Sequence, residues 1–246
     1  MHTYQIIIEY DGTNFVGWQK QKNGPSIQQT IEKILTKILK EKIILYGSGR
    51  TDAGVHAAGQ SAHFILKSKI NNKFLFLNSV NFFLYRKRIS ILKINKKKIN
   101  FHARFSAKKR EYKYVVFNRI APLSLEFNRA WHIKSTLNFK LMKQAAKLLE
   151  GNKDFSTFRS SSCNSRSPVK TLEDVIVKKS GSKIIIVFRS KSFLQQQVRS
   201  MVGCLKFVGE GKWSLEKFKY IIKSKTRANC APPAPAHGLY LFKIYY

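Results

Sequence analysis

The sequence predicts an α+β protein made of two similar units. Its 246 residues, 43% of them hydrophobic, can supply one large core or two small ones. Segments with the two-residue period of strands alternate along the chain with segments of helical period. Each half of the chain holds several strands and about two helices, although the halves share no repeated sequence.

The first half, residues 1–104, contains the clearest local signals. Ser26 and Gln29 have the spacing of a capping box, and isoleucine and leucine then recur on one face of a helix. Two strands flank the glycine-rich segment GSGRTDAGVHAAG, so this segment is predicted to be a loop between strands. The expected elements are strands over 3–10, 43–49, 60–66 and 89–94 and helices over 27–40 and 72–84.

The second half, residues 105–246, repeats this mixture. Two strands are joined at the turn Ser-Gly-Ser, residues 180–182, and a Ser-rich loop is expected over 156–167. A Pro-rich extended loop, CAPPAPAHG, precedes a closing strand, LYLFKIYY. The remaining expected elements are a strand over 111–118 and helices over 139–150, 195–208 and 214–224.

The charge balance is the strongest signal in the composition. Lys and Arg number 46 against 13 Asp and Glu, which gives a formal net charge of +33. Such a charge favours a polyanionic partner, and nucleic acid in particular, through phosphate contacts and counterion release. The alternative is a compositional bias that replaces ordinary surface residues with lysine.

Membrane and disulfide-rich classes are disfavoured. No stretch reaches the roughly 20 apolar residues of a membrane-spanning helix, and the first residues alternate like a strand, unlike a signal peptide. We therefore expect a cytoplasmic protein with no membrane partner. The three cysteines, Cys163, Cys204 and Cys230, lack CxxC spacing, so the sequence supports neither a disulfide framework nor a zinc site.

Asp52 lies in the segment GSGRTDAGVH and is one of only four aspartates in the chain. Asp and Gly close together are typical of a turn, so a structural role is one alternative. Arg50 and His56 on either side favour a functional carboxylate, because a neighbouring positive charge keeps a carboxylate ionised. The segment lacks the clustered carboxylates of a metal-dependent nuclease and the patterns of nucleotide-binding loops. Neither a metal nor a nucleotide cofactor is predicted.

A second candidate segment, FHARFSAKKREYKYVVFN, interleaves basic and aromatic residues. It places Tyr112 and Tyr114 on one face of a strand. Aromatic side chains among cations suit a stacked or flipped base. The alternative is a half-buried structural role, which we expect for Tyr114.

A third segment, FLQQQVRSMVG, sets Arg199 beside an apolar helix side. The apolar residues are Phe193, Val198, Met201 and Val202. An arginine in such a position either extends to solvent or pairs with a buried carboxylate.

Taken together, these motifs resemble the bacterial tRNA pseudouridine synthase A family. GRTDAGVHAAGQ is close to the signature of that family and is specific on its own. Other segments match in the same order over nearly the full length: DGTNFVGWQ, FHARFSAKKREYKY, GNKDFSTFR, CNSRSP, FLQQQVRSMVG and APAHGLYL.

The resemblance implies a cofactor-free isomerase that converts uridines at positions 38, 39 and 40 of the tRNA anticodon stem-loop to pseudouridine. Asp52 matches the catalytic aspartate of the family, and Arg50 matches a residue linked to base flipping. Tyr112 matches the residue that stacks on the target base, and Arg199 the ion-pair partner of the aspartate. The family also implies two α/β subdomains with mixed, mainly antiparallel sheets flanking a basic cleft, and a homodimer that binds the anticodon arm.

The sequence departs from the family pattern in three segments. LYRKRI, residues 84–89, replaces an expected LPxDI with a basic run, and FLQQQVR and GNKDF carry Gln or Lys where His is frequent. These differences concern loop shape and RNA contacts. Two alternatives remain: a non-catalytic tRNA- or rRNA-binding protein, and a pseudouridine synthase with different target uridines. Phosphate binding alone has no need of an aspartate beside Arg50, which disfavours the first.

Overall fold

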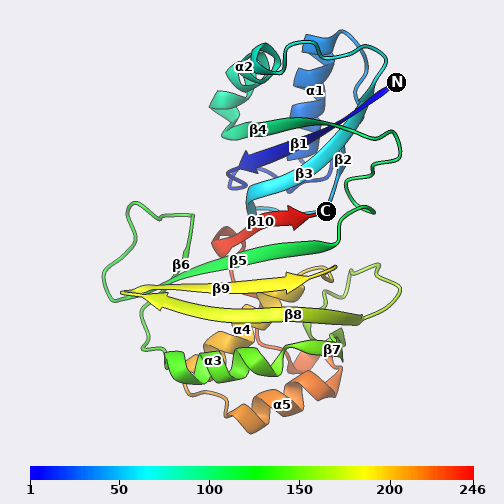
Figure 1. The fold of residues 1–246 in the computed structure, drawn as a ribbon. Coiled ribbons are helices and arrows are strands. Elements are labelled where there is room, and N and C mark those ends of the chain that lie inside the picture. The colour runs from blue at the N-terminus through cyan, green and yellow to red at the C-terminus, as the bar shows by residue number, and fades with distance from the viewer. The chain divides into compact units, whose positions relative to one another are not determined.

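A computed structural model describes residues 1–246 and divides them into two compact units (Figure 1). The first unit comprises Met1–Lys108 with Tyr240–Tyr246, and the second comprises Lys109–Leu239. The last strand therefore packs in the first unit, whereas the sequence assigned it to the second half. Each unit combines helices with strands that pair mainly antiparallel, which confirms the α+β fold class. None of the helices is both long and apolar enough to cross a membrane.

The first unit is a sheet with two helices. Its strand order is β4-β1-β3-β10, with a short β2 beside β3. β1 pairs antiparallel with β3 and β4, whereas β10 runs parallel to β3. In Figure 1, α1 and α2 lie on the same side of this sheet. The elements are β1 (His2–Tyr10), α1 (Ile27–Leu39), β2 (Tyr46–Gly47), β3 (His56–Leu66), α2 (Lys73–Leu84), β4 (Ile89–Lys97) and β10 (Leu239–Tyr245).

Helix α1 follows its sequence signals closely. The Ser26 hydroxyl accepts a hydrogen bond from the Gln29 N–H and caps the first turn. Ile27, Ile31 and Leu35 recur every fourth residue and are fully buried, so they attach the helix to the sheet. The predicted helix is confirmed to within one residue at its C-terminal end.

The strand predicted over 43–49 is much shorter in the structure. Only Tyr46 and Gly47 pair with β3. The Leu45 N–H donates to the Glu32 carboxylate at 2.9 Å, and the Leu45 carbonyl accepts from the Gln28 side chain at 2.9 Å. Side chains of α1 thus satisfy backbone groups that a strand would pair with its neighbour, and the strand begins only at Tyr46.

The second unit is also a sheet with helices on one side (Figure 1). Its strand order is β5-β9-β8-β7, with β6 parallel to β5. The strands are β5 (Lys109–Asn118), β6 (Trp131–Ile133), β7 (Gly151–Asp154), β8 (Val169–Ser180) and β9 (Lys183–Ser190). The helices are α3 (Phe139–Leu148), α4 (Gln197–Gly209) and α5 (Leu215–Ser224). The predicted β8–β9 turn at residues 180–182 is confirmed.

Helix α4 differs from the prediction in its start and its burial. It begins at Gln197, because Gln196 has a left-handed backbone with φ of 60° that cannot continue a helix. Residues on all sides of α4 are buried, so it lies inside the unit and is not a surface helix with one apolar side. Phe193, predicted to lie on this helix, precedes it.

Candidate active site

The Asp52 loop, defined here as residues 48–55, connects β2 to β3 in the first unit, as predicted. Thr51 and Val55 are buried, whereas Asp52 is partly exposed and Arg50 is exposed. The backbone of the loop is thus anchored inside the unit while its charged side chains lie nearer the surface.

The segment that follows β1 holds one side of the Asp52 loop. The Thr51 carbonyl accepts a hydrogen bond from the Trp18 N–H at 3.1 Å, and the Thr51 hydroxyl lies 2.8 Å from the Tyr10 hydroxyl. Gly12 comes so close to the loop that a methyl group on it would lie 2.1 Å from the Val55 carbonyl oxygen. Only glycine fits there. These contacts explain why DGTNFVGWQ and GRTDAGVH occur together in one sequence.

Strand β3 holds the other side of the loop. The side chain of the fully buried Gln60 accepts a hydrogen bond from the Ser48 hydroxyl at 2.8 Å. It also donates a hydrogen bond to the Gly49 carbonyl at 2.8 Å. His56 Nδ1 accepts a hydrogen bond from the Gly12 N–H at 2.9 Å. Sequence reasoning assigned no anchoring role to Gln60 or His56. A glutamine within a buried strand is the signal that could have indicated the first.

Asp11 extends this support to β4. Its carboxylate lies 3.3 Å from His56 Nδ1 and accepts a hydrogen bond from Arg88 at 3.2 Å. Burial acts to raise the pKa of Asp11, but hydrogen bonds from Thr13 and the nearby His56 and Arg88 outweigh burial, and the pKa is lowered. Asp11 therefore stays ionised at neutral pH and ties the start of the DGTNF segment to the sheet.

Tyr112 lies on β5 in the second unit, with its ring against Phe193. The ring centroids are 5.1 Å apart and the planes meet at 83°, an edge-to-face contact. Only 8% of Tyr112 is exposed. Sequence reasoning missed this role of Phe193, because the left-handed Gln196 that separates it from α4 leaves no local signal.

Tyr114 has the structural role that the sequence favoured. It is fully buried, and its hydroxyl donates to the Pro235 carbonyl at 2.8 Å. Burial raises the pKa of its phenol. Tyr114 therefore anchors the Pro-rich segment to β5 in its neutral form.

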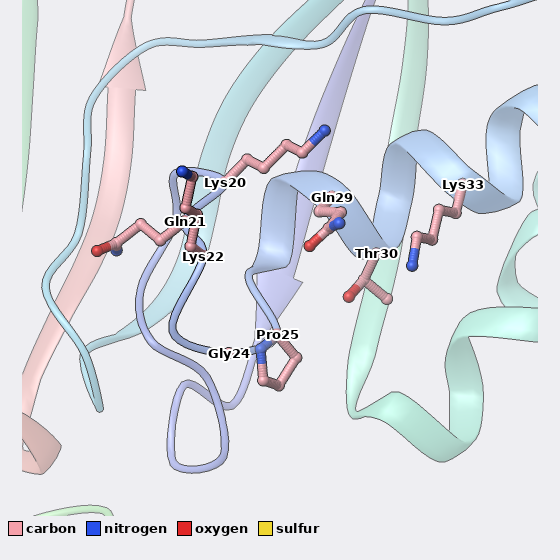
Figure 2. A pocket seen from close by; sticks show the side chains of 8 residues that line it. All are labelled: Lys20, Gln21, Lys22, Gly24, Pro25, Gln29, Thr30 and Lys33. Carbon is pink, nitrogen blue, oxygen red and sulfur yellow. The ribbon is translucent and has the colours of Figure 1, made fainter.

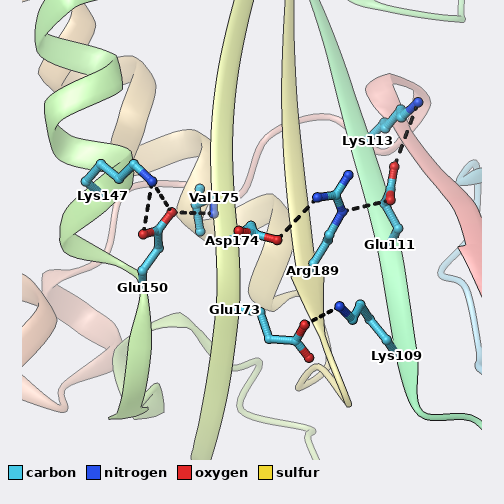
Figure 3. Close-up of polar contacts among 9 residues, drawn as sticks. All are labelled: Lys109, Glu111, Lys113, Lys147, Glu150, Glu173, Asp174, Val175 and Arg189. Atoms are coloured by element: carbon cyan, nitrogen blue, oxygen red, sulfur yellow. Dashed lines mark hydrogen bonds and ion pairs between the residues drawn. The ribbon is translucent and has the colours of Figure 1, made fainter. Parts of the chain in front are cut away.

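Figure 3 shows a charged network around Glu111 on β5. Because successive side chains of a strand point to opposite faces, the network lies on the face of β5 opposite Tyr112. Arg189 on β9 donates to the buried Glu111 at 2.9 Å and to Asp174 on β8 at 3.2 Å. Lys113 lies 3.8 Å from Glu111. Because Arg189 joins three neighbouring strands, this network fixes the register of the strand that carries Tyr112.

Arg199 lies in the first turn of α4 and is held by residues 232–234. Its Nε donates to the Ala234 carbonyl at 2.8 Å, and the Ala234 N–H donates to the Arg199 carbonyl at 2.9 Å. One turn further along α4, a methyl group on Gly203 would lie 2.1 Å from the Pro232 carbonyl oxygen. The segment therefore runs along α4 in close contact and fixes the position of the guanidinium.

Two basic pockets lie away from the predicted site residues. One, of about 560 Å³, is formed by the segment before α1 and the first turns of that helix (Figure 2). Its lining includes Lys20, Lys22 and Lys33 and no acidic residue. The other, of about 710 Å³, lies in the second unit and is lined by five lysines and one aspartate. Both pockets suit an anionic partner.

The predicted site residues divide between the units. Arg50 and Asp52 share the Asp52 loop of the first unit, and Tyr112 and Arg199 belong to the second. No group of three or more His, Cys, Asp or Glu side chains is arranged to hold a metal ion.

Comparison with known proteins identifies one family. The family model described as tRNA pseudouridine synthase matches residues 6–106 and 145–246. tRNA pseudouridine synthase A of Pelagibacter ubique is 58% identical over 246 residues, which cover all of both chains. The proteins of the same name from Ehrlichia chaffeensis and Parvibaculum lavamentivorans are each 44% identical, over 99% and 100% of both chains.

The matched ranges contain the anchors of the Asp52 loop, Arg199 and the segment at residues 232–234 that holds it, whereas Tyr112 lies between the two ranges. Identity over the whole length leaves no large segment of this chain without a counterpart in the relatives. The chain belongs to the tRNA pseudouridine synthase family.

Proposed function

We propose that the protein isomerises uridines at positions 38–40 of the tRNA anticodon stem-loop to pseudouridine, with Asp52 as the nucleophile. The Asp52 loop carries this proposal. Its sequence is close to the family signature, and its backbone is fixed on one side by the segment after β1 and on the other by β3. A carboxylate on an anchored backbone, partly open to solvent, is what covalent catalysis requires.

The reaction needs no co-reactant, because pseudouridine is an isomer of uridine. The Asp52 carboxylate attacks the ribose or the uracil ring, and the bond from C1′ of the ribose to N1 of the base breaks. The base then rotates, C5 bonds to C1′, the bond to the Asp52 carboxylate breaks, and the C5 proton leaves while N1 takes up a proton. Tyr112 stacks on the base and assists this proton transfer. The edge-to-face contact with Phe193 supports this role because it fixes the plane of the tyrosine ring.

The remaining roles concern access and charge. A uridine in a duplex stem must leave its stack before a carboxylate can reach it. Arg50, exposed on the same loop as Asp52, is proposed to promote this flipping. Arg199 is proposed as the ion-pair partner that keeps the aspartate charged and oriented, a role for which its planar guanidinium is well suited.

The net charge of +33 and the two lysine-lined pockets support binding of the anticodon arm through phosphate contacts. The affinity for tRNA should therefore fall steeply with salt, with log K linear in log salt concentration. A filter-binding series at several salt concentrations measures this slope, and an affinity that does not depend on salt would contradict the binding mode. We further propose a homodimer, which light scattering of the purified protein tests.

The decisive experiment replaces the nucleophile. Asp52→Asn keeps the size and turn preference of the residue but removes the charge, so pseudouridine formation should be lost while tRNA binding persists. Glu216→Gln is the control for the loss of one carboxylate and should turn over normally, because Glu216 is exposed in the first turn of α5 and lines neither pocket. Pseudouridine is mapped in tRNA that has been folded before EDTA is added.

Each result has a separate meaning. A folded Asp52→Asn variant with wild-type turnover would contradict the catalytic assignment. Modification by the wild-type protein only outside positions 38–40 would contradict the proposed target. Turnover that EDTA abolishes and a divalent cation restores would contradict the cofactor-free reaction.

A further inference from the structure

Cys204 and Cys230 are in contact in the second unit, although they are 26 positions apart in the sequence. Their sulfur atoms lie 3.5 Å from each other. Cys204 is fully buried on α4, whereas Cys230 follows the 3₁₀ turn Arg227–Asn229 and is partly exposed. The tertiary fold alone creates this pair, so the spacing of cysteines in the sequence did not indicate it.

The two thiols have different environments. Arg227 donates to the Ser200 hydroxyl at 3.2 Å, and Ser200 lies one turn before Cys204 on α4, which places a guanidinium beside the sulfur pair. A hydrogen bond from Cys204 and the charge of Arg227 lower the pKa of Cys230. The same hydrogen bond, together with burial, raises the pKa of Cys204. The thiolate therefore forms on Cys230, the more exposed residue of the pair.

We propose that Cys204 and Cys230 are a peroxide-oxidisable thiol pair that closes into an intramolecular disulfide, and that closure lowers turnover by moving the segment that holds Arg199. The first part of this inference is independent of the enzyme's activity. The second part rests on the proposed function.

The oxidation balances with hydrogen peroxide as the oxidant. The Cys230 thiolate attacks one peroxide oxygen, the O–O bond breaks, hydroxide leaves, and Cys230 becomes a sulfenic acid. The Cys204 sulfur then attacks the sulfenic sulfur, the S–S bond forms, the S–O bond breaks, and water leaves with the Cys204 proton. Two thiols are oxidised and one peroxide is reduced to water. A dithiol reductant reverses the bond by exchange.

Formation of the disulfide must move the segment that begins at Cys230 and not helix α4. A disulfide requires the sulfurs at about 2.05 Å, so the pair must approach from its 3.5 Å separation. Cys204 is fixed because α4 is buried on all sides. Cys230 begins the segment that passes Gly203 at Pro232 and bonds Arg199 at Ala234. A shift at Cys230 is therefore transmitted to the partner of the Arg199 guanidinium, and a displacement of about 1 Å at a catalytic group costs roughly a hundredfold in rate.

The first measurement tests the disulfide alone. The purified protein is treated with hydrogen peroxide, unfolded, and its thiols are counted with a maleimide before peptide mapping. Wild-type protein and the Cys163→Ser control should each lose two thiols and the mass of two hydrogen atoms within a monomer. Cys204→Ser should stop at a sulfenic acid that dimedone traps on Cys230. Retention of both thiols, or a bond that involves Cys163, would overturn the inference.

The second measurement tests the link to Arg199. Oxidised wild-type protein should lose at least about tenfold in turnover and regain it with dithiothreitol, whereas Cys204→Ser and Cys230→Ser should keep the turnover of reduced wild type. A disulfide that forms without loss of turnover would overturn the link. If the reduced protein makes no pseudouridine, the proposed function fails, and hydrogen exchange of the Ala234 amide then decides the link: altered protection on oxidation supports it and unchanged protection overturns it.

Discussion

The Asp52 loop and helix α4 hold Asp52 and Arg199 in opposite ways. The loop is irregular backbone, fixed by specific hydrogen bonds from Trp18 and Gln60 and by the close approach of Gly12. Helix α4 is regular and buried on all sides, and its arginine is oriented by the segment that runs along it. A loop held in this way depends on particular residues at fixed positions, whereas apolar packing around a helix tolerates exchange among residues of similar volume.

Two glycine substitutions should each destabilise one of the two regions through the same steric clash. Gly12→Ala and Gly203→Ala each place a methyl group 2.1 Å from a backbone carbonyl oxygen. We expect each to cost about 1–3 kcal/mol of unfolding free energy. Gly12→Ala displaces the Asp52 loop and should also lower kcat/KM by about a hundredfold.

Gly181→Ala is the control for these variants, because a methyl group there meets no atom within 4 Å. It should retain turnover and lose at most about 1 kcal/mol from its left-handed backbone. Urea unfolding and kcat/KM for tRNA measure both effects. Wild-type turnover in a folded Gly12→Ala variant would show that the loop does not need its glycine anchor.

The second prediction asks whether the two regions act as a unit. Arg199→Ala should lower turnover by at least about tenfold, because the proposed charge partner of Asp52 is lost. Arg199→Lys keeps the charge without the planar fork and should be partly active. In the double variant Asp52→Ala with Arg199→Ala, unfolding free energies should deviate from additivity by about 0.5–3 kcal/mol. Costs that simply add would show that the two residues do not interact.

The smallest expected effect is a different response of the two regions to acid. Burial and the neighbouring His102 lower the pKa of His63, on the strand that supports the Asp52 loop, to about 4. Unfolded chains bind a proton at this residue near its ordinary pKa of about 6.5, so its contribution to stability is complete above that pH and is lost as pH falls toward 4.

Glu210, at the end of α4, should respond only at lower pH. Burial acts to raise its pKa, but hydrogen bonds from Lys206, Ser135 and Lys212 lower the pKa to about 2. Its contribution is therefore complete above about pH 4.5 and is lost toward pH 2. The melting temperature should depend less on pH than in the wild type in each variant. The change should fall between pH 6.5 and 4 for His63→Asn and below pH 4.5 for Glu210→Gln. Identical profiles of melting temperature against pH for the two variants would contradict the different pKa shifts of His63 and Glu210.

Local chemistry explains what the sequence predicted well. Ser26, Asn72 and Ser214 each cap the helix that begins at the next residue, and a glycine with positive φ closes the β8–β9 turn. The Asp52 motif could also be recognised from the sequence, because a loop fixed by backbone contacts restricts the residues allowed at each position. Signals of this kind act over a few residues and need no knowledge of the rest of the fold.

Features that depend on distant contacts could not be predicted. The late start of β2 follows from side chains of α1, and the contact of Phe193 with Tyr112 joins segments far apart in the chain. The proximity of Cys204 and Cys230 has the same origin. In each case the deciding partner lies well outside any window in which a sequence pattern can be recognised.

The position of β10 has a consequence for synthesis on the ribosome. This strand pairs with β3 at His56 and Ala57, directly after the Asp52 loop, and the Tyr240 ring lies 4.9 Å from that of His56. The strand is translated last, whereas domains generally fold as they emerge at about 5–20 residues per second. The first unit therefore lacks the strand beside its Asp52 loop until the last residues of the chain have been made. A product truncated before residue 239 would carry the complete signature motif without the strand that supports it, so activity would be coupled to completion of translation.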